Sequence, residues 1–173
     1  MQSCNSGIIA RYNDKGRLKQ AIQHDSTGQK LYSDPILITE NKNGDVIVSD
    51  CYYFANGAVV VTESGGRHRF SYRGLPSGSG LLPLGICTDA LSHILVCDLI
   101  TDTIHMLGRD GHFLSFILTR HQGINKPMGL SYDDKTHLLW VGLRYGEKRL
   151  CVYRYIERQD YLQYVTNQSK INI

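Results

Sequence analysis

A repeated segment constrains the fold of this chain more than any other feature. Three stretches align without a gap over sixteen columns: PILITENKNGDVIVSD from Pro35, PLGICTDALSHILVCD from Pro83 and PMGLSYDDKTHLLWVG from Pro127. The starting prolines lie 48 and then 44 residues apart. Each copy carries a small or apolar pair, a polar turn and a short apolar run. Self-similarity at this period indicates a fold built from stacked, equivalent units.

The short apolar runs predict β-strands. The runs 46–48, 94–96 and 138–140 are bounded by turn residues and show no sustained helical spacing. A third strand is expected at 58–62, 103–107 and 150–153, and a fourth at 69–72 and 113–118. Four strands in about 46 residues are typical of a β-propeller blade. The predicted fold class is therefore all-β, as a partial propeller of about three and a half four-stranded blades.

The start of the chain fits the same frame out of phase. Ile8-Ile9, the turn at 14–16 and the run 18–22 match the third strand, the turn and the fourth strand of a blade. The first two strands of that blade are missing. We expect a half blade at 1–30, blades at 31–78, 79–122 and 123–165, and a C-terminal tail at 166–173.

The residues that open and close each repeat carry a family resemblance. Pro83-Leu84-Gly85-Ile86 with Val96-Cys97-Asp98 resembles the NHL repeat, and Pro35 with Val48-Ser49-Asp50 is the next best match. The third unit departs from this pattern, with Gly142 where the aspartate is expected. The stretch from Gly44 to Tyr161 is similar to the C-terminal propeller of tripartite-motif (TRIM) proteins, especially the expanded invertebrate type.

This resemblance implies a six-bladed ring, which would need about 276 residues at about 46 per blade. The chain is expected to be a fragment, a truncated product or a half-ring that pairs with another copy. An open half-ring leaves two unprotected strand edges that invite self-association. The resemblance also implies a RING, a B-box and a coiled coil ahead of the propeller, whose zinc-ligand spacings are absent from this sequence. Any ligase activity would therefore belong to the parent architecture.

Composition favours a cytoplasmic protein without cofactors. The five cysteines form no C-x-x-C pair, which suits a reducing compartment. No apolar stretch reaches 18 residues and no signal-peptide pattern opens the chain, so no membrane contact is expected. The seven histidines form no H-x-H or H-x-x-x-H pair, so no metal site is predicted.

The long loops at one end of a propeller are the expected binding surface, because binding residues concentrate on loops carried by a rigid scaffold. These loops follow the second strands or join the blades, and they are rich in aromatic and basic residues, which are common at interface hot spots. The candidate partner-binding residues are Tyr52, Tyr53, Phe54, Arg73, Arg120, His121, Lys126, Arg144, Tyr145, Lys148 and Arg149. The alternative for any one of them is packing beneath its own loop or plain solvation.

Other conspicuous residues have structural explanations. Asp50 and Asp98 are expected to cap loops through the backbone and not to act as catalytic carboxylates. Trp140, Cys87 and Cys97 are expected in the core. The basic cluster at 67–69 is expected near an outer edge strand, where charge discourages edge pairing.

Three functions remain open from the sequence. The first is a non-catalytic propeller that recognises a protein partner or ubiquitination substrate within a tripartite-motif E3 ubiquitin ligase architecture. The second is a single-stranded RNA-binding NHL propeller, since aromatic rings and guanidinium planes stack on unpaired bases. The third is a metal-dependent hydrolase or lyase, for which the first strands offer Thr39-Glu40, Cys87-Thr88-Asp89 and Ser131-Tyr132 in no matching pattern.

Overall fold

The computed structural model describes residues 7–52, 56–76, 78, 80–145 and 150–156. Within these residues the chain is all-β, as predicted, with one short 3-10 turn, η1 (Arg120–Gln122). The strands are β1 (Ile9–Tyr12), β2 (Leu18–Ile22), β3 (Pro35–Glu40), β4 (Val46–Asp50), β5 (Ala58–Thr62), β6 (His68–Tyr72), β7 (Pro83–Thr88), β8 (Ile94–Asp98), β9 (Thr103–Leu107), β10 (Phe113–Leu118), β11 (Pro127–Asp133), β12 (Leu138–Leu143) and β13 (Leu150–Arg154).

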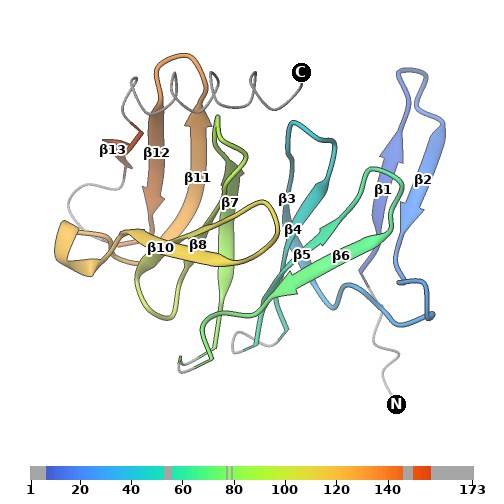
Figure 1. The fold of residues 1–173 in the computed structure, drawn as a ribbon, viewed down its shortest axis with the longest axis horizontal. Helices are drawn as coiled ribbons and strands as arrows, with labels where there is room; N and C mark the ends of the chain where they lie inside the picture. The colour runs from blue at the N-terminus through green and yellow to red at the C-terminus, as the bar shows by residue number, and fades with distance from the viewer. Residues whose placement is uncertain (1–6, 53–55, 77, 79, 146–149, 157–173) are drawn as a thin grey trace, which may run out of the picture.

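The strands form four antiparallel meanders that succeed one another along the chain. These are the pair β1-β2, the four-stranded sheets β3 to β6 and β7 to β10, and the three-stranded sheet β11 to β13. The first strands of successive sheets, β3, β7 and β11, contact one another. Figure 1 shows the sheets fanned out from these inner strands, with β1-β2 at one end and β11 to β13 at the other. The fourth strand expected for the last blade falls outside the described residues.

The core lies between successive sheets. Side chains alternate along each strand, so one set faces the preceding sheet and the other faces the following sheet. In β4, Val46 and Val48 pack with Ile22 of the preceding hairpin, whereas Ile47 packs with Ile94 of the following sheet. Strands β4, β5 and β8 are therefore buried on both faces, which explains their continuous apolar sequence.

Close backbone contacts explain the glycines of the repeat. A Cβ atom on Gly85 would lie 2.8 Å from the Gly129 carbonyl carbon and from the Leu130 nitrogen, so β7 approaches β11 more closely there than a side chain allows. A Cβ on Gly57 or on Gly7 would lie 2.2 Å from the Cδ atom of Pro83 or Pro35, respectively. Gly7 thus occupies before β1 the position that Gly57 occupies before β5. This shared contact supports the prediction that β1 and β2 are the third and fourth strands of a blade.

The last sheet departs from the gapless alignment by one residue. Pro35 pairs with Asp50 and Pro83 with Asp98, but Pro127 pairs with Leu143. The extra residue lies in the turn between Tyr132 and Leu139. Tyr132 follows Pro127 at the same distance as Thr88 follows Pro83, but the paired residue on the second strand, Leu139, comes one residue later than Ile94 does. Leu143, and not Gly142, therefore occupies the position of the repeat aspartate.

The prediction that Trp140 is a core residue is wrong for the same reason. The insertion turns Trp140 to the face that Ile47 and Leu95 occupy in the other sheets, which looks toward the following blade. Those two counterparts are fully buried, whereas Trp140 is 39% exposed. Cys87 and Cys97 are buried, as expected.

Candidate functional site

The long loops and the tight turns lie at opposite ends of the molecule. In Figure 1 the β1-β2, β3-β4, β7-β8 and β11-β12 turns point upward, and the described parts of the segments that join β4 to β5 and β6 to β7 lie at the bottom. We call the end that carries these long loops the loop end. The described members of the predicted binding set lie in segments that follow a second strand or join two blades. That these residues bind a partner stays a prediction.

The aspartates that end the second strands, Asp50 and Asp98, fix the loop backbone by accepting hydrogen bonds from its N–H groups. Both oxygens of the Asp50 carboxylate accept from the Ser33 N–H, at 2.9 and 3.0 Å, and Oδ1 also accepts from the Asp34 N–H at 2.8 Å. Asp98 Oδ1 accepts from the Leu82 N–H at 3.0 Å and from the Ile100 N–H at 3.1 Å. Burial raises the pKa of Asp50, and these backbone donors oppose that effect. The sequence-based expectation that both aspartates cap loops agrees with these hydrogen bonds.

The last blade replaces this cap with an aspartate from its neighbour. The Leu143 side chain cannot accept a hydrogen bond, and the Lys126 N–H, which corresponds to the Leu82 N–H, donates instead to Asp102 Oδ1 at 2.9 Å. The Lys126 ammonium also donates to the Leu99 carbonyl at 2.8 Å. Lys126 is therefore engaged in the loop scaffold on both its backbone and its side chain, which leaves it less able to contact a partner than its sequence position indicates.

Aromatic and basic side chains project from the loop end. Tyr52 and Tyr145 are each about half exposed, and the Arg144 guanidinium lies over the Tyr145 ring, 5.4 Å from its centroid. Such a pair presents a planar, partly apolar surface that carries a positive charge. Tyr53, Phe54, Lys148 and Arg149 lie outside the described residues.

The inter-blade loops add further exposed cations. Arg73 and His121 are exposed. Arg120, in η1, has a 78% exposed side chain whose guanidinium lies 3.9 Å from Asp102, so this ion pair contributes little and leaves the charge accessible. The structure thus brings several of the predicted residues to one end of the molecule without assigning a ligand to them.

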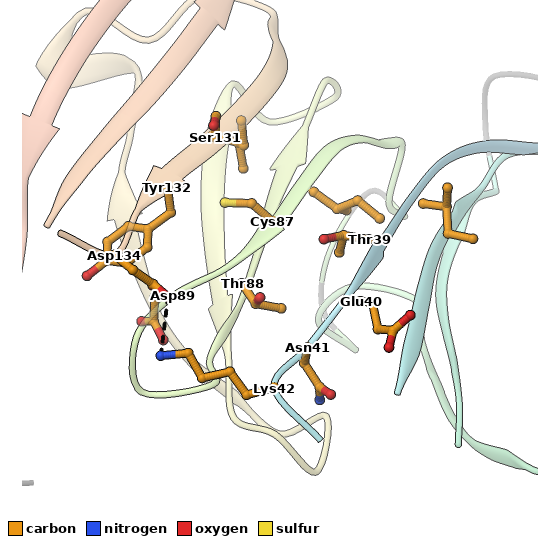
Figure 2. A pocket seen from close by; sticks show the side chains of 13 residues that line it. Thr39, Glu40, Asn41, Lys42, Cys87, Thr88, Asp89, Ser131, Tyr132 and Asp134 are labelled. Carbon is orange, nitrogen blue, oxygen red and sulfur yellow. Dashed lines mark ion pairs between the residues drawn. The ribbon is translucent and has the colours of Figure 1, made fainter. Parts of the chain in front are cut away.

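A groove of about 450 Å³ lies along the inner strands, at the turn end of the molecule. It is lined by residues from β3, β7 and β11, including the three first-strand segments that were considered for catalysis. Figure 2 shows Lys42 reaching across it to Asp134, and the two charged groups lie 3.3 Å apart. The Lys42 ammonium also donates to the Ala90 carbonyl at 3.3 Å.

Asp89, the most buried carboxylate of this groove, is fully engaged by its surroundings. Its Oδ1 accepts from the Leu91 and His93 N–H groups, both at 2.8 Å. Its Oδ2 lies 2.8 Å from His93 Nδ1 and accepts from the Tyr155 hydroxyl at 2.7 Å. Burial beside this carboxylate raises the pKa of Tyr155. Asp89 therefore stabilises its own turn and links this turn to the last blade through Tyr155.

The other reactive groups of the groove have equally structural surroundings. Burial raises the pKa of the Cys87 thiol to about 12, so the thiol stays protonated and weakly nucleophilic at neutral pH. No group of three or more His, Cys, Asp or Glu side chains suited to holding a metal ion occurs within the described ranges. Over the same ranges, no helix has the length and apolarity required to span a membrane.

His105 is a buried titratable group that sequence reasoning did not single out. Its ring lies between blades, with Nδ1 2.8 Å from the Tyr72 hydroxyl and with edge contacts to Phe113 and Phe116. Its Nε2 is buried without a hydrogen-bond partner and lies 3.8 Å from Asp98 Oδ2. Burial lowers the pKa of His105, against the opposing attraction of Asp98. The sequence gives no sign of this buried histidine, because its burial results from the packing of one blade on the next.

Arg69 has a different role from the one expected for a charge near an outer edge. Its guanidinium lies 2.5 Å from Asp45 and 3.0 Å from Asp110, which belongs to the turn of the next sheet. Arg69 therefore ties two blades together. Arg67 pairs with Glu63 within its own turn.

The meandering sheets, their common inner strands and their face-to-face cores define a β-propeller. Comparison with solved structures agrees: the chain is similar to streptogramin B lyase (TM-score 0.55, 16% identity, covering 91% of this chain and 51% of that one). It is also similar to virginiamycin B lyase from Staphylococcus aureus (TM-score 0.53, 16% identity, 88% and 50%). A third similar structure is a protein from Bacteroides uniformis assigned as a 6-phosphogluconolactonase (TM-score 0.60, 12% identity, 90% and 48%).

These likenesses define the fold alone, because the sequence identities are low. No family model matches the chain, and no curated protein matches it. The chain spans about half the length of the solved structures named above. Proteins named as enzymes occur among these neighbours, so the fold is compatible with catalysis in other proteins.

Proposed function

We propose that this chain is a non-catalytic recognition segment of a β-propeller, which binds a protein partner through its loop end. The observation that carries the proposal is the set of exposed aromatic and basic groups there, above all Tyr52 and the stacked pair Arg144 and Tyr145. Rigid aromatic area next to guanidinium groups is the composition of interface hot spots. The Asp50 cap lies next to the loop that carries Tyr52. Near the stacked pair, Asp102 accepts from the Lys126 N–H, and the Lys126 carbonyl accepts from the Arg144 N–H at 2.9 Å.

The TRIM resemblance would extend this function to a larger architecture. Within it, the chain would be the substrate- or partner-recognition part of an E3 ubiquitin ligase whose catalytic RING lies outside this sequence. Pro83-Leu84-Gly85-Ile86 and Val96-Cys97-Asp98 support this assignment. Gly85 and Asp98 also have structural roles in blade packing and loop capping. The motif is therefore stronger evidence for the blade fold than for the kind of partner.

Affinity capture with matched variants tests the proposal. The loop-end variant carries Tyr52→Ala, Arg144→Ala and Tyr145→Ala, and the control carries Arg109→Ala and Lys135→Ala, two exposed cations in the tight turns. We expect a protein that the wild type and the control enrich and that the loop-end variant loses by about tenfold or more, the loss that about 1.4 kcal/mol of hot-spot energy produces. Equal recovery by all three forms would exclude the loop end.

Single-stranded RNA is the second candidate, favoured by the stacked Arg144 and Tyr145. Fluorescence anisotropy with labelled RNA at about 50 and 200 mM salt distinguishes the two ligands, because contacts to phosphates weaken steeply with salt. Binding at low salt that the loop-end variant abolishes would favour RNA. Absence of binding at low salt would remove this candidate. Catalysis in the groove is less favoured than either kind of binding. The Asp89 carboxylate is occupied by a hydrogen bond from Tyr155, and the Cys87 thiol is protonated at neutral pH.

A further inference from the structure

The two ends of the blade array expose faces that are buried at every other blade junction. In the last sheet, Trp140 lies directly opposite Val152, and Gly142 lies opposite Leu150, so these side chains share one face. Their counterparts in the preceding sheet pair in the same way, Leu95 with Met106 and Cys97 with Ile104. We call the face formed by Trp140, Leu150 and Val152 the outgoing face, because the equivalent residues pack on the following blade.

The outgoing face is apolar and accessible within the described part of the chain. Leu95 and Ile104 are fully buried by the last sheet, whereas Trp140, Val152 and Leu150 are 39%, 42% and 60% exposed. Exposed apolar side chains that cluster on one face mark interaction surfaces, so we expect this face to be covered by another protein surface. The one-residue insertion after Tyr132 is what places Trp140 there.

The opposite end of the same chain carries the complementary face. Ile8, Ala10 and Tyr12 correspond to Ala58, Val60 and Thr62, which are buried against the preceding blade. Ile8 and Tyr12 are both more than half exposed. We call Ile8, Ala10 and Tyr12 the incoming face. Figure 1 shows β1-β2 and β11 to β13 at the two ends of the array.

We propose that the outgoing face binds the incoming face of a second copy of this chain, so that two copies associate head to tail into a closed assembly. The contact would continue the blade-on-blade packing that already joins the described sheets. A heterologous contact between two different faces closes when the rotation per subunit permits it.

Sedimentation velocity on the full chain, over a range of concentrations, tests the stoichiometry. We expect a dimer for the wild type. Trp140→Glu and Tyr12→Glu should each weaken self-association at least tenfold, because each places a charge in an apolar junction. Val152→Glu is a second outgoing-face variant in case Trp140→Glu does not fold. The control is Leu114→Glu, an equally exposed apolar residue on β10 that lies on neither end face. Circular dichroism checks that each variant is folded.

A mixing experiment distinguishes head-to-tail association from packing of like faces. A mixture of Trp140→Glu and Tyr12→Glu retains one intact outgoing and one intact incoming face, so it should form a heterodimer that neither variant forms alone. Trp140 is the single tryptophan, and its emission should shift to shorter wavelength as the wild type dimerises. A wild type that stays monomeric at all concentrations, or a dimer that both face variants leave intact, overturns the proposal. Either result leaves the loop-end function untouched, because the loop-end variant alters other residues.

Discussion

At the scale of single residues, the molecule depends on positions where nothing larger than the native group fits. Gly85 is one such position, because the neighbouring inner strand runs against its Cα. His105 is another, because its ring fills the space between Tyr72 and two phenylalanines at a blade junction. The sequence pattern identified the first through its motif. It could not identify the second, because the positions equivalent to His105 in the other sheets hold Val60 and Cys151, so no motif marks this position.

Replacing Gly85 with alanine should destabilise the chain by about 1–3 kcal/mol, the usual cost of forcing extra volume into a packed contact. The added Cβ would meet backbone atoms of β11 at 2.8 Å, and backbone cannot move aside as a flexible side chain can. Gly129→Ala is the matched control, since its Cβ would meet nothing within 4 Å. Urea unfolding measures both variants. Equal stability of the two would contradict the close approach of β7 and β11.

The stability of the chain should fall as the pH drops below about 6.5, the ordinary pKa of histidine. The folded state lowers the pKa of His105 through burial, so the unfolded chain binds more protons over this range and gains stability relative to the native state. The loss should begin near the unfolded pKa and level off below the lower, folded pKa. Urea midpoints of wild type and His105→Gln between pH 7.5 and 5 measure this effect, and an unchanged slope in the variant would exclude His105 as its source.

At the scale of elements, each blade depends on a cap that closes its loop end. Asp50 and Asp98 cap their own blades, but the last blade borrows Asp102 from its neighbour. The repeat predicted the strands closely, because short apolar runs between turns have few other uses. It did not predict the borrowed cap, because that contact joins residues 24 positions apart that no motif relates. Lys126 looked available in the sequence for the same reason.

Asp98→Ala should cost about 1–3 kcal/mol, because it leaves the Leu82 and Ile100 N–H groups buried or half-buried without their acceptor. Asp14→Ala, in the exposed β1-β2 turn, should leave stability within about 0.5 kcal/mol of the wild type. Thermal unfolding compares the two. A similar melting temperature for both variants would show that the cap is not stabilising.

At the scale of the whole molecule, stability is distributed along a line of blades. Among the described residues the apolar cores join neighbouring sheets, and the Lys42–Asp134 ion pair crosses the groove between two sheets that are not neighbours. The middle sheets are therefore covered on both faces and the end sheets on one. The loop end follows from this arrangement, since every blade sends its long loops the same way. A sequence can therefore predict which end carries the long loops, whereas the accessibility of each side chain depends on stacking that the repeat does not encode.

Hydrogen exchange should rank the strands by this position. We expect the slowest exchange in β4, β5 and β8, which are buried throughout, and the fastest in β1, β2 and β13. Mass spectrometry of peptides at dilute concentration measures the order. Faster exchange in β8 than in β1 would contradict the blade-by-blade picture. Protection gained by β1 and β13 at high concentration would agree with head-to-tail association.

The extra residue in the β11-β12 turn carries a consequence for how such surfaces change over time. Because side chains alternate along a strand, lengthening a turn by one residue exchanges the inward and outward sets of the whole strand that follows. In this chain that exchange turns a tryptophan outward with no substitution in the strand itself. Insertions and deletions in exposed turns, usually regarded as neutral, can thus create or erase an assembly interface in a single step. Related chains with one residue fewer in this turn should present the opposite set of β12 side chains at this end.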